Sequence, residues 1–306
     1  MLPPRSRCRT QADVVAAFRL AVGAVLAIAV LLTFAGPASA TWSIVATDPD
    51  TGEVGAAIAS CVPGEVLGDL DKPLVPVVLA PGTSAAVTQA QLNIDAPARI
   101  VELTTAGATP GEIIEGLTDE EFDDLAPLRQ HAVAATTGEV AAFTGAETNE
   151  VALDAQGDAV SVQGNILVAP AVVDDALARF EASRTAGRSL GDALVAALDA
   201  GSLAGGDSRC DEQTALFAQV VVAAPTDDAN APSTILTVVV DEGDGQNPVA
   251  LLVDAYANGD RGVVEAGDPS TGSNIFTIGV LAFSAAMIVG GILVVRRGIG
   301  SVRARR

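Results

Sequence analysis

The stretch TWSIVATDPDTGEVGAAIAS, residues 41–60, decides the fold. TWSIVAT (41–47) and GEVGAAIAS (52–60) are apolar runs of strand length, and the Pro, Asp and Gly residues of DPDTG between them are typical of a hairpin turn. We therefore expect an antiparallel β-hairpin that begins at Thr41.

Residues 1–40, which precede this hairpin, have the form of a secretory signal peptide. Basic residues come first, the apolar run 20–34 follows, and Ala38 and Ala40 fit the A-x-A cleavage pattern. We expect cleavage after Ala40. The alternative is an uncleaved membrane anchor, which would leave Thr41 an ordinary residue at the start of a strand. The basic residues are Arg5, Arg7, Arg9 and Arg19.

Cleavage after Ala40 would place a hydroxyl and a free α-amine on the same residue, Thr41. A terminal amine has a pKa near 8 in model peptides, so it can accept the hydroxyl proton at neutral pH. This arrangement activates a nucleophile without a separate histidine. Thr41 is therefore the candidate nucleophile, and its own α-amine is the candidate base.

The C-terminal part of the sequence predicts a membrane anchor. Residues 268–274 form a linker, the apolar run 275–295 is long enough to cross a bilayer, and the basic tail 296–306 follows it. We expect a single-pass protein that this helix anchors in the lipid bilayer, with its N-terminal domain facing outward and its tail in the cytoplasm. A buried core helix is the alternative, but no polar stripe interrupts the run.

The part of the chain between the leader and the tail is strongly acidic. The leader holds four and the tail five of the 17 Lys and Arg residues, and only Asp13 of the 38 acids lies there, so the rest carries a net charge of −29. Such a charge argues against nucleic acid as a partner. The acid clusters TDEEFDD (118–124) and DEGDGQN (241–247) lack the pattern of an EF-hand calcium loop. The sequence predicts no metal site and no cofactor.

Two cysteines remain after export, because Cys8 leaves with the leader. In an oxidising compartment, Cys61 and Cys210 are expected to form a disulfide. The alternative is a catalytic thiol at Cys61, but no histidine-bearing motif accompanies it.

We expect residues 41–267 to form one extracytoplasmic domain that contains both strands and helices. The strand-like runs come as hairpins and the helical patterns come in consecutive pairs, which predicts two antiparallel sheets covered by helices, an α/β sandwich. Besides the first hairpin, the expected strands are 74–80, 84–90, 131–136, 139–144, 161–168, 216–224 and 234–240, and the expected helices are 98–106, 111–117, 170–183 and 189–200.

Several short motifs follow the hairpin in order and together resemble a bacterial family of unknown function placed in the N-terminal nucleophile (Ntn) hydrolase superfamily. After TWSIVATDPDTGEVGAAIAS they are VTQAQLN (87–93), Arg129 with Gln130, FTGAE (143–147), QGNILV (163–168) and AGGD (204–207). The resemblance implies an αββα sandwich and amide-bond hydrolysis, and it implies no particular substrate. The chain departs from the family pattern at Phe143, at 147–156 and at 208–216.

The proposed chemistry needs donors for an oxyanion. Asn165 is the candidate donor, and Gln163 and Gly164 would assist it or bind substrate; a tight turn or strand bulge is the alternative for this motif. Asp207 and Arg209 would orient the terminal amine or bind a substrate carboxylate, or else form an internal ion pair beside the disulfide.

Other polar residues lie at the ends of expected strands. Ser60, Gln89 and Asn93 would line the same cleft, or else serve as ordinary sheet and turn residues. His131, the only histidine, is expected to be structural.

Two classes of function therefore stay open. The first is a cell-surface amidohydrolase acting on a small amide or peptide. The second is an inert surface binding or scaffold module on the same fold. An oligomer is compatible with both.

Overall fold

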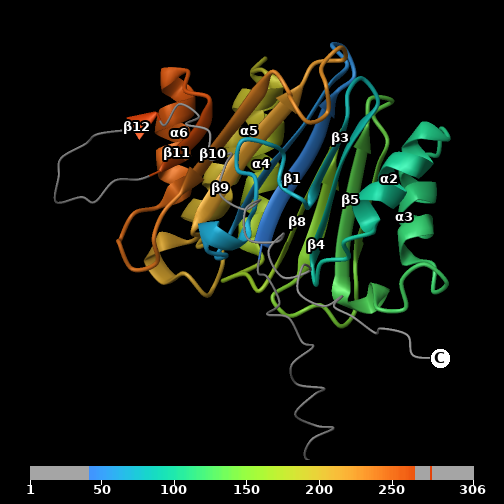
Figure 1. Ribbon diagram of the computed structural model, residues 1–306, viewed down its shortest axis with the longest axis horizontal. Coiled ribbons are helices and arrows are strands. Elements are labelled where there is room, and N and C mark those ends of the chain that lie inside the picture. The colour runs from blue at the N-terminus through green and yellow to red at the C-terminus, as the bar shows by residue number, and fades with distance from the viewer. Residues whose placement is uncertain (1–40, 266–275, 278–306) are drawn as a thin grey trace, which may run out of the picture.

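The computed structural model describes residues 41–265 and 276–277 (Figure 1). This part of the chain is a mixed α+β structure with two β-sheets and five α-helices. The strands are β1 (Thr41–Asp48), β2 (Glu53–Ser60), β3 (Val77–Ala80), β4 (Ser84–Ala90), β5 (Arg129–Ala135), β6 (Val140–Thr144), β7 (Leu153–Gly157), β8 (Val160–Asn165), β9 (Phe217–Ala223), β10 (Thr234–Val239), β11 (Gly262–Glu265) and β12 (Phe276–Thr277).

The larger sheet, here called the large sheet, has the order β12-β11-β10-β9-β2-β1-β8-β7, and only its β10–β11 pair is parallel. The small sheet has the antiparallel order β3-β4-β5-β6. The predicted hairpin is confirmed: β1 pairs with β2 from Thr41 opposite Ser60 to Asp48 opposite Glu53. On its other side β1 pairs with β8, so the first strand is central in the large sheet.

The helices cover the outer faces of the two sheets. In Figure 1, α2 (Ala96–Thr105) and α3 (Pro110–Thr118) lie against the small sheet, and α4 (Ala171–Thr185) and α5 (Leu190–Leu203) lie against the large sheet, with α6 (Pro248–Asn258) at its β10 side. Three short 3-10 turns, η1 (Gly64–Val66), η2 (Ala126–Leu128) and η3 (Asp211–Gln213), lie in the connections.

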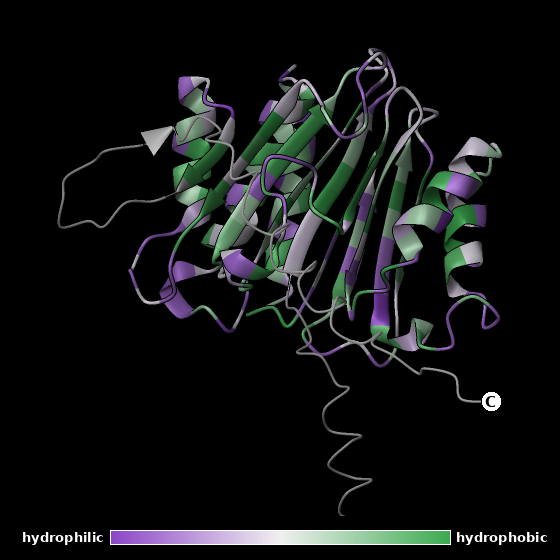
Figure 2. Ribbon diagram, in the orientation of Figure 1, coloured by the Kyte–Doolittle hydropathy of each residue, from purple (hydrophilic) through white to green (hydrophobic). Residues whose placement is uncertain are grey.

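Three apolar cores follow from these layers, and Figure 2 shows mainly hydrophobic residues along the strands of the large sheet. One core packs the large sheet on α4, α5 and α6, and its largest side chain is Trp42 of β1. A second fills the space between the two sheets, and a third packs the small sheet on α2 and α3. Because β1 is buried on both faces, its alternate residues contribute to two cores.

Besides β12, the sequence analysis missed three elements. Helix α6 carries the signals of a helix, since Asn247 caps its first turn through bonds from the amides of Val249 and Ala250, Pro248 follows, and Gly259 ends it with φ 83°. Strand β7 is an edge strand with weak β propensity that pairs with β8. Strand β11 is held only through its parallel pairing with β10 and two residues of β12.

The predicted leader, residues 1–40, lies outside the described residues, as does most of the predicted span 275–295. Phe276 and Thr277 of that span are described, and there they form β12 rather than helix. Within 41–265 and 276–277, no helix has the length and apolar character needed to span a bilayer.

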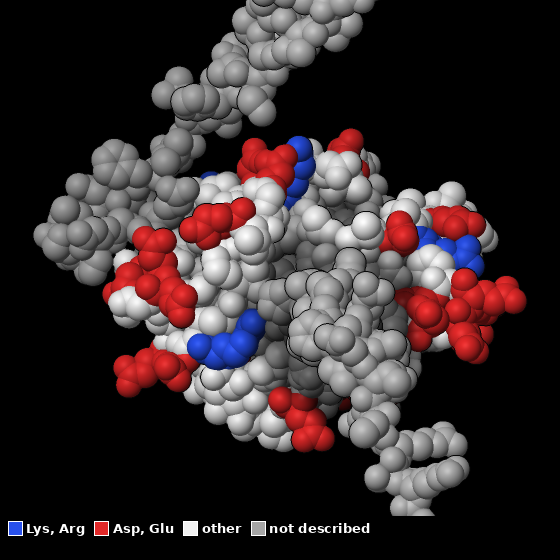
Figure 3. All heavy atoms as spheres, turned by 60° about the horizontal axis from the view of Figure 1, so that its bottom comes forward, with Lys and Arg blue, Asp and Glu red and all other residues white. Residues whose placement is uncertain are grey.

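The acidic balance of the sequence is visible on the surface. On the face drawn in Figure 3, Asp and Glu side chains predominate over Lys and Arg. Of the ion pairs in the described part, the Arg129–Asp123 pair is the most buried, with side chains 8% and 4% exposed.

His131 of β5 lies under α2 and α3 and is 1% exposed. Neither ring nitrogen has a hydrogen-bond partner in the part of the chain that the structure describes, and the ring stacks on Phe143 at 6.3 Å between centroids. Burial lowers the pKa of His131 to about 4. The nearby Asp123 carboxylate raises this pKa, but by less than burial lowers it. The only histidine of the chain is therefore neutral in the fold, in keeping with a structural role.

We expect His131 to make the protein acid-sensitive. The unfolded chain takes up this proton near pH 6.5 and the folded chain only near pH 4, so stability is complete above about pH 6.5 and falls toward pH 4, by about 3 kcal/mol. Urea unfolding at pH 7 and pH 4.5 measures the loss. In His131→Leu the difference between the two pH values should shrink by about that amount, and an unchanged difference would contradict the assignment.

Candidate functional site

The first residue of β1, Thr41, lies between two polar cross-strand partners. Ser60 at the end of β2 is opposite it on one side, and Asn165 at the end of β8 is opposite it on the other. Residues that alternate with Thr41 along β1 face the small sheet, since Ser43 bonds to Gln89 of β4 and Val45 belongs to the core between the sheets. Thr41 therefore presents its side chain to the space between the two sheets.

A cavity of about 220 Å³ adjoins Thr41 there. Thr41 itself is 5% exposed, and the polar residues beside it on the cavity wall are Ser60 and Gln89. Most of the other lining residues come from the segment 62–76; they are Ile58, Val62, Val66, Leu67, Leu74, Val75, Pro76, Ala90, Leu92 and Phe217.

A buried polar network connects the two sheets next to this cavity, with Gln130 of β5 at its centre. The Gln130 amide nitrogen donates to the Gly164 carbonyl at 2.8 Å and to Thr144 Oγ1 at 3.1 Å. Its Oε1 accepts from Gln89 Nε2 at 3.1 Å and from Asn165 Nδ2 at 3.0 Å. Every polar atom of the Gln130 side chain is thus used to fix its neighbours.

The network reaches Thr41 through Gln89. Its Nε2 lies 3.4 Å from the Thr41 carbonyl oxygen, and its Oε1 accepts from Ser43 Oγ at 2.6 Å. Gln163 donates to Ser43 Oγ at 2.5 Å and accepts from Ser161 at 3.2 Å. Gln163 and Gly164, predicted as substrate-binding residues, therefore lie in the network and not among the residues that line the cavity.

The network also fixes the orientation of Asn165. Gln130 cannot reverse its amide, because its nitrogen serves carbonyl and hydroxyl acceptors, so Asn165 must turn its nitrogen toward Gln130. This leaves Asn165 Oδ1 buried without a hydrogen-bond partner among the described residues. Asn165 is 1% exposed and shares a face with Thr41, its cross-strand partner.

The backbone is strained directly after two of these residues. Ala90, which follows Gln89, has φ 70°, and Ile166, which follows Asn165, has φ 52°. A positive φ is costly for residues with a Cβ and most costly for a β-branched one. Such strain persists where the surrounding structure over-determines a conformation, which is common at functional sites.

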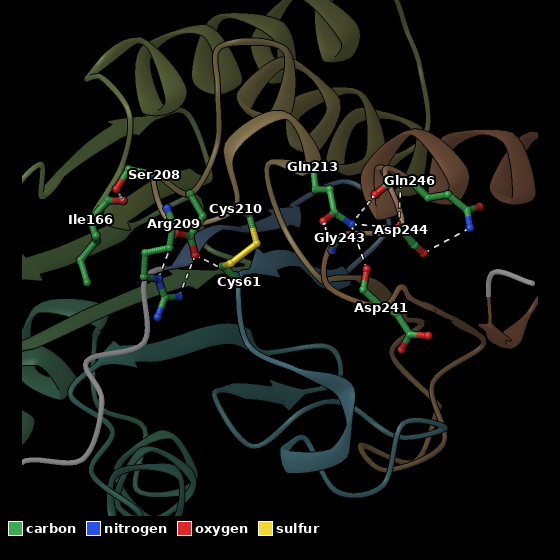
Figure 4. Close-up of a disulfide and its surroundings, with 11 residues drawn as sticks. Cys61, Ile166, Ser208, Arg209, Cys210, Gln213, Asp241, Gly243, Asp244 and Gln246 are labelled. Atoms are coloured by element: carbon green, nitrogen blue, oxygen red, sulfur yellow. Dashed lines mark hydrogen bonds and ion pairs between the residues drawn. A yellow bond between two sulfur atoms is a disulfide. The ribbon is translucent and has the colours of Figure 1, made fainter. Parts of the chain in front are cut away.

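Asp207 and Arg209 lie beside the disulfide, as Figure 4 shows for Arg209. Asp207 is fully buried and accepts from the Cys61 backbone amide at 2.7 Å and from Arg209 Nη2 at 2.8 Å. The ion-pair alternative is therefore what the structure displays, and it anchors the chain just beyond Ser60. The Arg209 side chain is 32% exposed.

The predicted Cys61–Cys210 disulfide is present and joins residues that are 149 positions apart in the sequence.

Asn93, which the sequence placed in the same cleft, is not among the residues that line the cavity. Its side-chain amide donates to Asp123 at 2.8 Å. Among residues 41–265, no group of three or more His, Cys, Asp or Glu side chains is placed to hold a metal ion.

Sequence reasoning missed the central role of Gln130 and the role of Ser43 in the network. Both lie in strands whose residues are almost all buried, and a polar side chain in such a strand is a signal for a buried network. The segment 62–76 gave no signal, because its contact with Thr41 depends on the tertiary fold.

Comparison with known proteins agrees with this architecture. No curated protein matches the chain. The crystal structure of protein SPO2555 from Silicibacter pomeroyi is similar, with a TM-score of 0.56 and 25% identity over 72% of this chain and 86% of that chain. That protein is itself assigned to DUF1028, a family of unknown function, and the model of the same family matches residues 41–252 here. The chain therefore belongs to the DUF1028 family.

Proposed function

We propose that the protein is an Ntn-type amidohydrolase of the cell surface whose nucleophile, Thr41, becomes the first residue when the signal peptide is removed. The observation that carries this proposal is the position of Thr41: it begins an interior strand of the large sheet, faces the space between the sheets, and adjoins a cavity. The family match, which also begins at Thr41, supports it.

In the proposed reaction, the Thr41 hydroxyl attacks the carbonyl carbon of an amide while the α-amine takes the hydroxyl proton. The amine then returns this proton to the departing nitrogen, the C–N bond breaks, and an ester remains on Thr41. Water, activated by the same amine, hydrolyses the ester and restores the hydroxyl.

The surrounding residues have positioning roles in this proposal. Asn165 Oδ1, buried and without a partner in the described part, is suited to accept a hydrogen bond from the protonated α-amine of its neighbour Thr41. One of the two Asn165 N–H groups is used by Gln130, and the second is the candidate oxyanion donor. Asp207 holds the Cys61 amide and so positions the end of β2 that bears Ser60.

The start of the mature protein tests the proposal. N-terminal sequencing of the exported protein, isolated from the envelope of its host, should read TWSIVATD, because signal peptidase would cut after Ala40. A mature chain that begins at any other residue would deprive the reaction of nucleophile and base together.

A further inference from the structure

The cavity beside Thr41 is polar on one side only. Its polar lining residues are Thr41 and two neighbours of Thr41, since Ser60 is paired with Thr41 and Gln89 approaches the Thr41 carbonyl. All other lining residues are aliphatic side chains, a proline and Phe217, and none carries a charge. A group bound there would meet hydrogen-bonding partners near Thr41 and apolar contacts elsewhere.

The apolar lining continues to the surface. Val66, Val75 and Leu92 line the cavity and yet are 71%, 54% and 40% exposed. Large exposed apolar side chains gathered around one opening are typical of a binding site for an apolar group.

The wall that carries these residues is held in place. Gln219 of β9 accepts from the Leu74 amide at 3.0 Å and donates to the Lys72 carbonyl at 2.9 Å, and Thr237 donates to the Leu70 carbonyl at 2.8 Å. The disulfide at Cys61 fixes the other end of the segment. The cavity is therefore preformed, which lowers the entropic cost of binding.

We propose that this cavity binds the acyl part of the substrate, and that the substrate class is amides of uncharged aliphatic acids with a chain of about six to eight carbons. A cavity of about 150 Å³ accepts one benzene molecule, so 220 Å³ suits a chain of this length. A charged acyl group is excluded because no lining residue would pair with it. The inference rests on the proposed function only for the placement of the scissile carbonyl at Thr41.

Binding without turnover tests the cavity separately from catalysis. The exported Thr41→Ala protein, cut after residue 40, is titrated calorimetrically with unbranched primary amides from propanamide to decanamide. Affinity should rise about fourfold for each added methylene and level off near octanamide, where the cavity is full. An affinity independent of chain length, or equal affinity for an amide that ends in a carboxylate, would overturn the proposal.

A pair of surface variants provides the matched control. Val75→Asp places a charge at the opening, and Val101→Asp places the same charge on α2, away from the cavity, at a residue of similar exposure (49%). Val75→Asp should weaken octanamide binding at least about tenfold and leave propanamide unaffected, whereas Val101→Asp should change neither. Equal effects of the two variants would contradict the proposed site.

The wild-type chain then separates the two proposals. If the amides bind as expected but no anilide of the same acids is hydrolysed, the cavity stands and the proposed catalytic role of Thr41 fails. If acetyl and octanoyl anilides are hydrolysed equally fast, Thr41 stands and the assignment of the cavity fails.

Discussion

Replacing Thr41 by alanine should reduce hydrolysis of an acyl anilide by about a thousandfold or more, to the background rate. The change removes the only atom proposed to form the ester intermediate, and removal of a nucleophile has effects of this size or larger in other hydrolases. Thr41→Ser keeps both the hydroxyl and the α-amine, so it should retain activity. The rate of anilide hydrolysis is measured for the wild-type protein, Thr41→Ala and Thr41→Ser.

Thr47 provides the matched control for this prediction. It lies on the same strand and face as Thr41, is buried to a similar degree, and its hydroxyl donates to the Ala135 carbonyl at 2.9 Å. Thr47→Ala should cost about 1 kcal/mol of stability and leave the rate constant of hydrolysis unchanged. Activity that survives in Thr41→Ala, or that is lost equally in Thr47→Ala, would count against the nucleophile.

Reducing the Cys61–Cys210 disulfide should lower the melting temperature by about 10 °C or more. The bridge closes a loop with a separation of 149 residues, for which the chain-entropy model gives about 5 kcal/mol, and a domain of this size loses about 2–4 °C per kcal/mol. Calorimetric melting with and without a reductant measures the change.

The double variant Cys61→Ser with Cys210→Ser is the control for the disulfide. It should melt like the reduced wild-type protein and respond to reductant no further, because no disulfide is left to reduce. Asp207 can still accept from the backbone amide of residue 61, so the local structure should be kept. Two free thiols in the exported protein, found by mass spectrometry, would refute the bridge.

Local sequence signals predicted much of the fold. The β1–β2 hairpin follows from two apolar runs around DPDTG, and the start of α3 follows from Thr109, which caps the helix together with Glu112. The disulfide was predictable because the sequence holds only two cysteines outside the predicted leader. Helix α6 was missed although Asn247, Pro248 and Gly259 mark its ends, because it follows an acidic segment that resembles a loop.

The arrangement of the candidate site depended on pairings that the sequence does not reveal. Thr41 and Asn165 are far apart in the chain and meet only because β8 joins the open side of β1. The orientation of Asn165 depends in turn on Gln130, which reaches it from the other sheet. The sequence placed Gln89 and Asn93 together at the end of one strand. Ala90, in the left-handed conformation, turns the chain away from the cavity after Gln89, and Asn93 donates to Asp123 instead.

The central claim is that one residue supplies both the nucleophile and the base, and a reagent that must react with both tests it most directly. An epoxyketone with an apolar side chain can join a terminal threonine twice, since the hydroxyl adds to the ketone and the α-amine opens the epoxide. After treatment of the exported protein, peptide mass spectrometry should find the full mass of the reagent on the peptide that begins at Thr41. Modification at another residue, or an unmodified Thr41 peptide under the same conditions, would contradict the account.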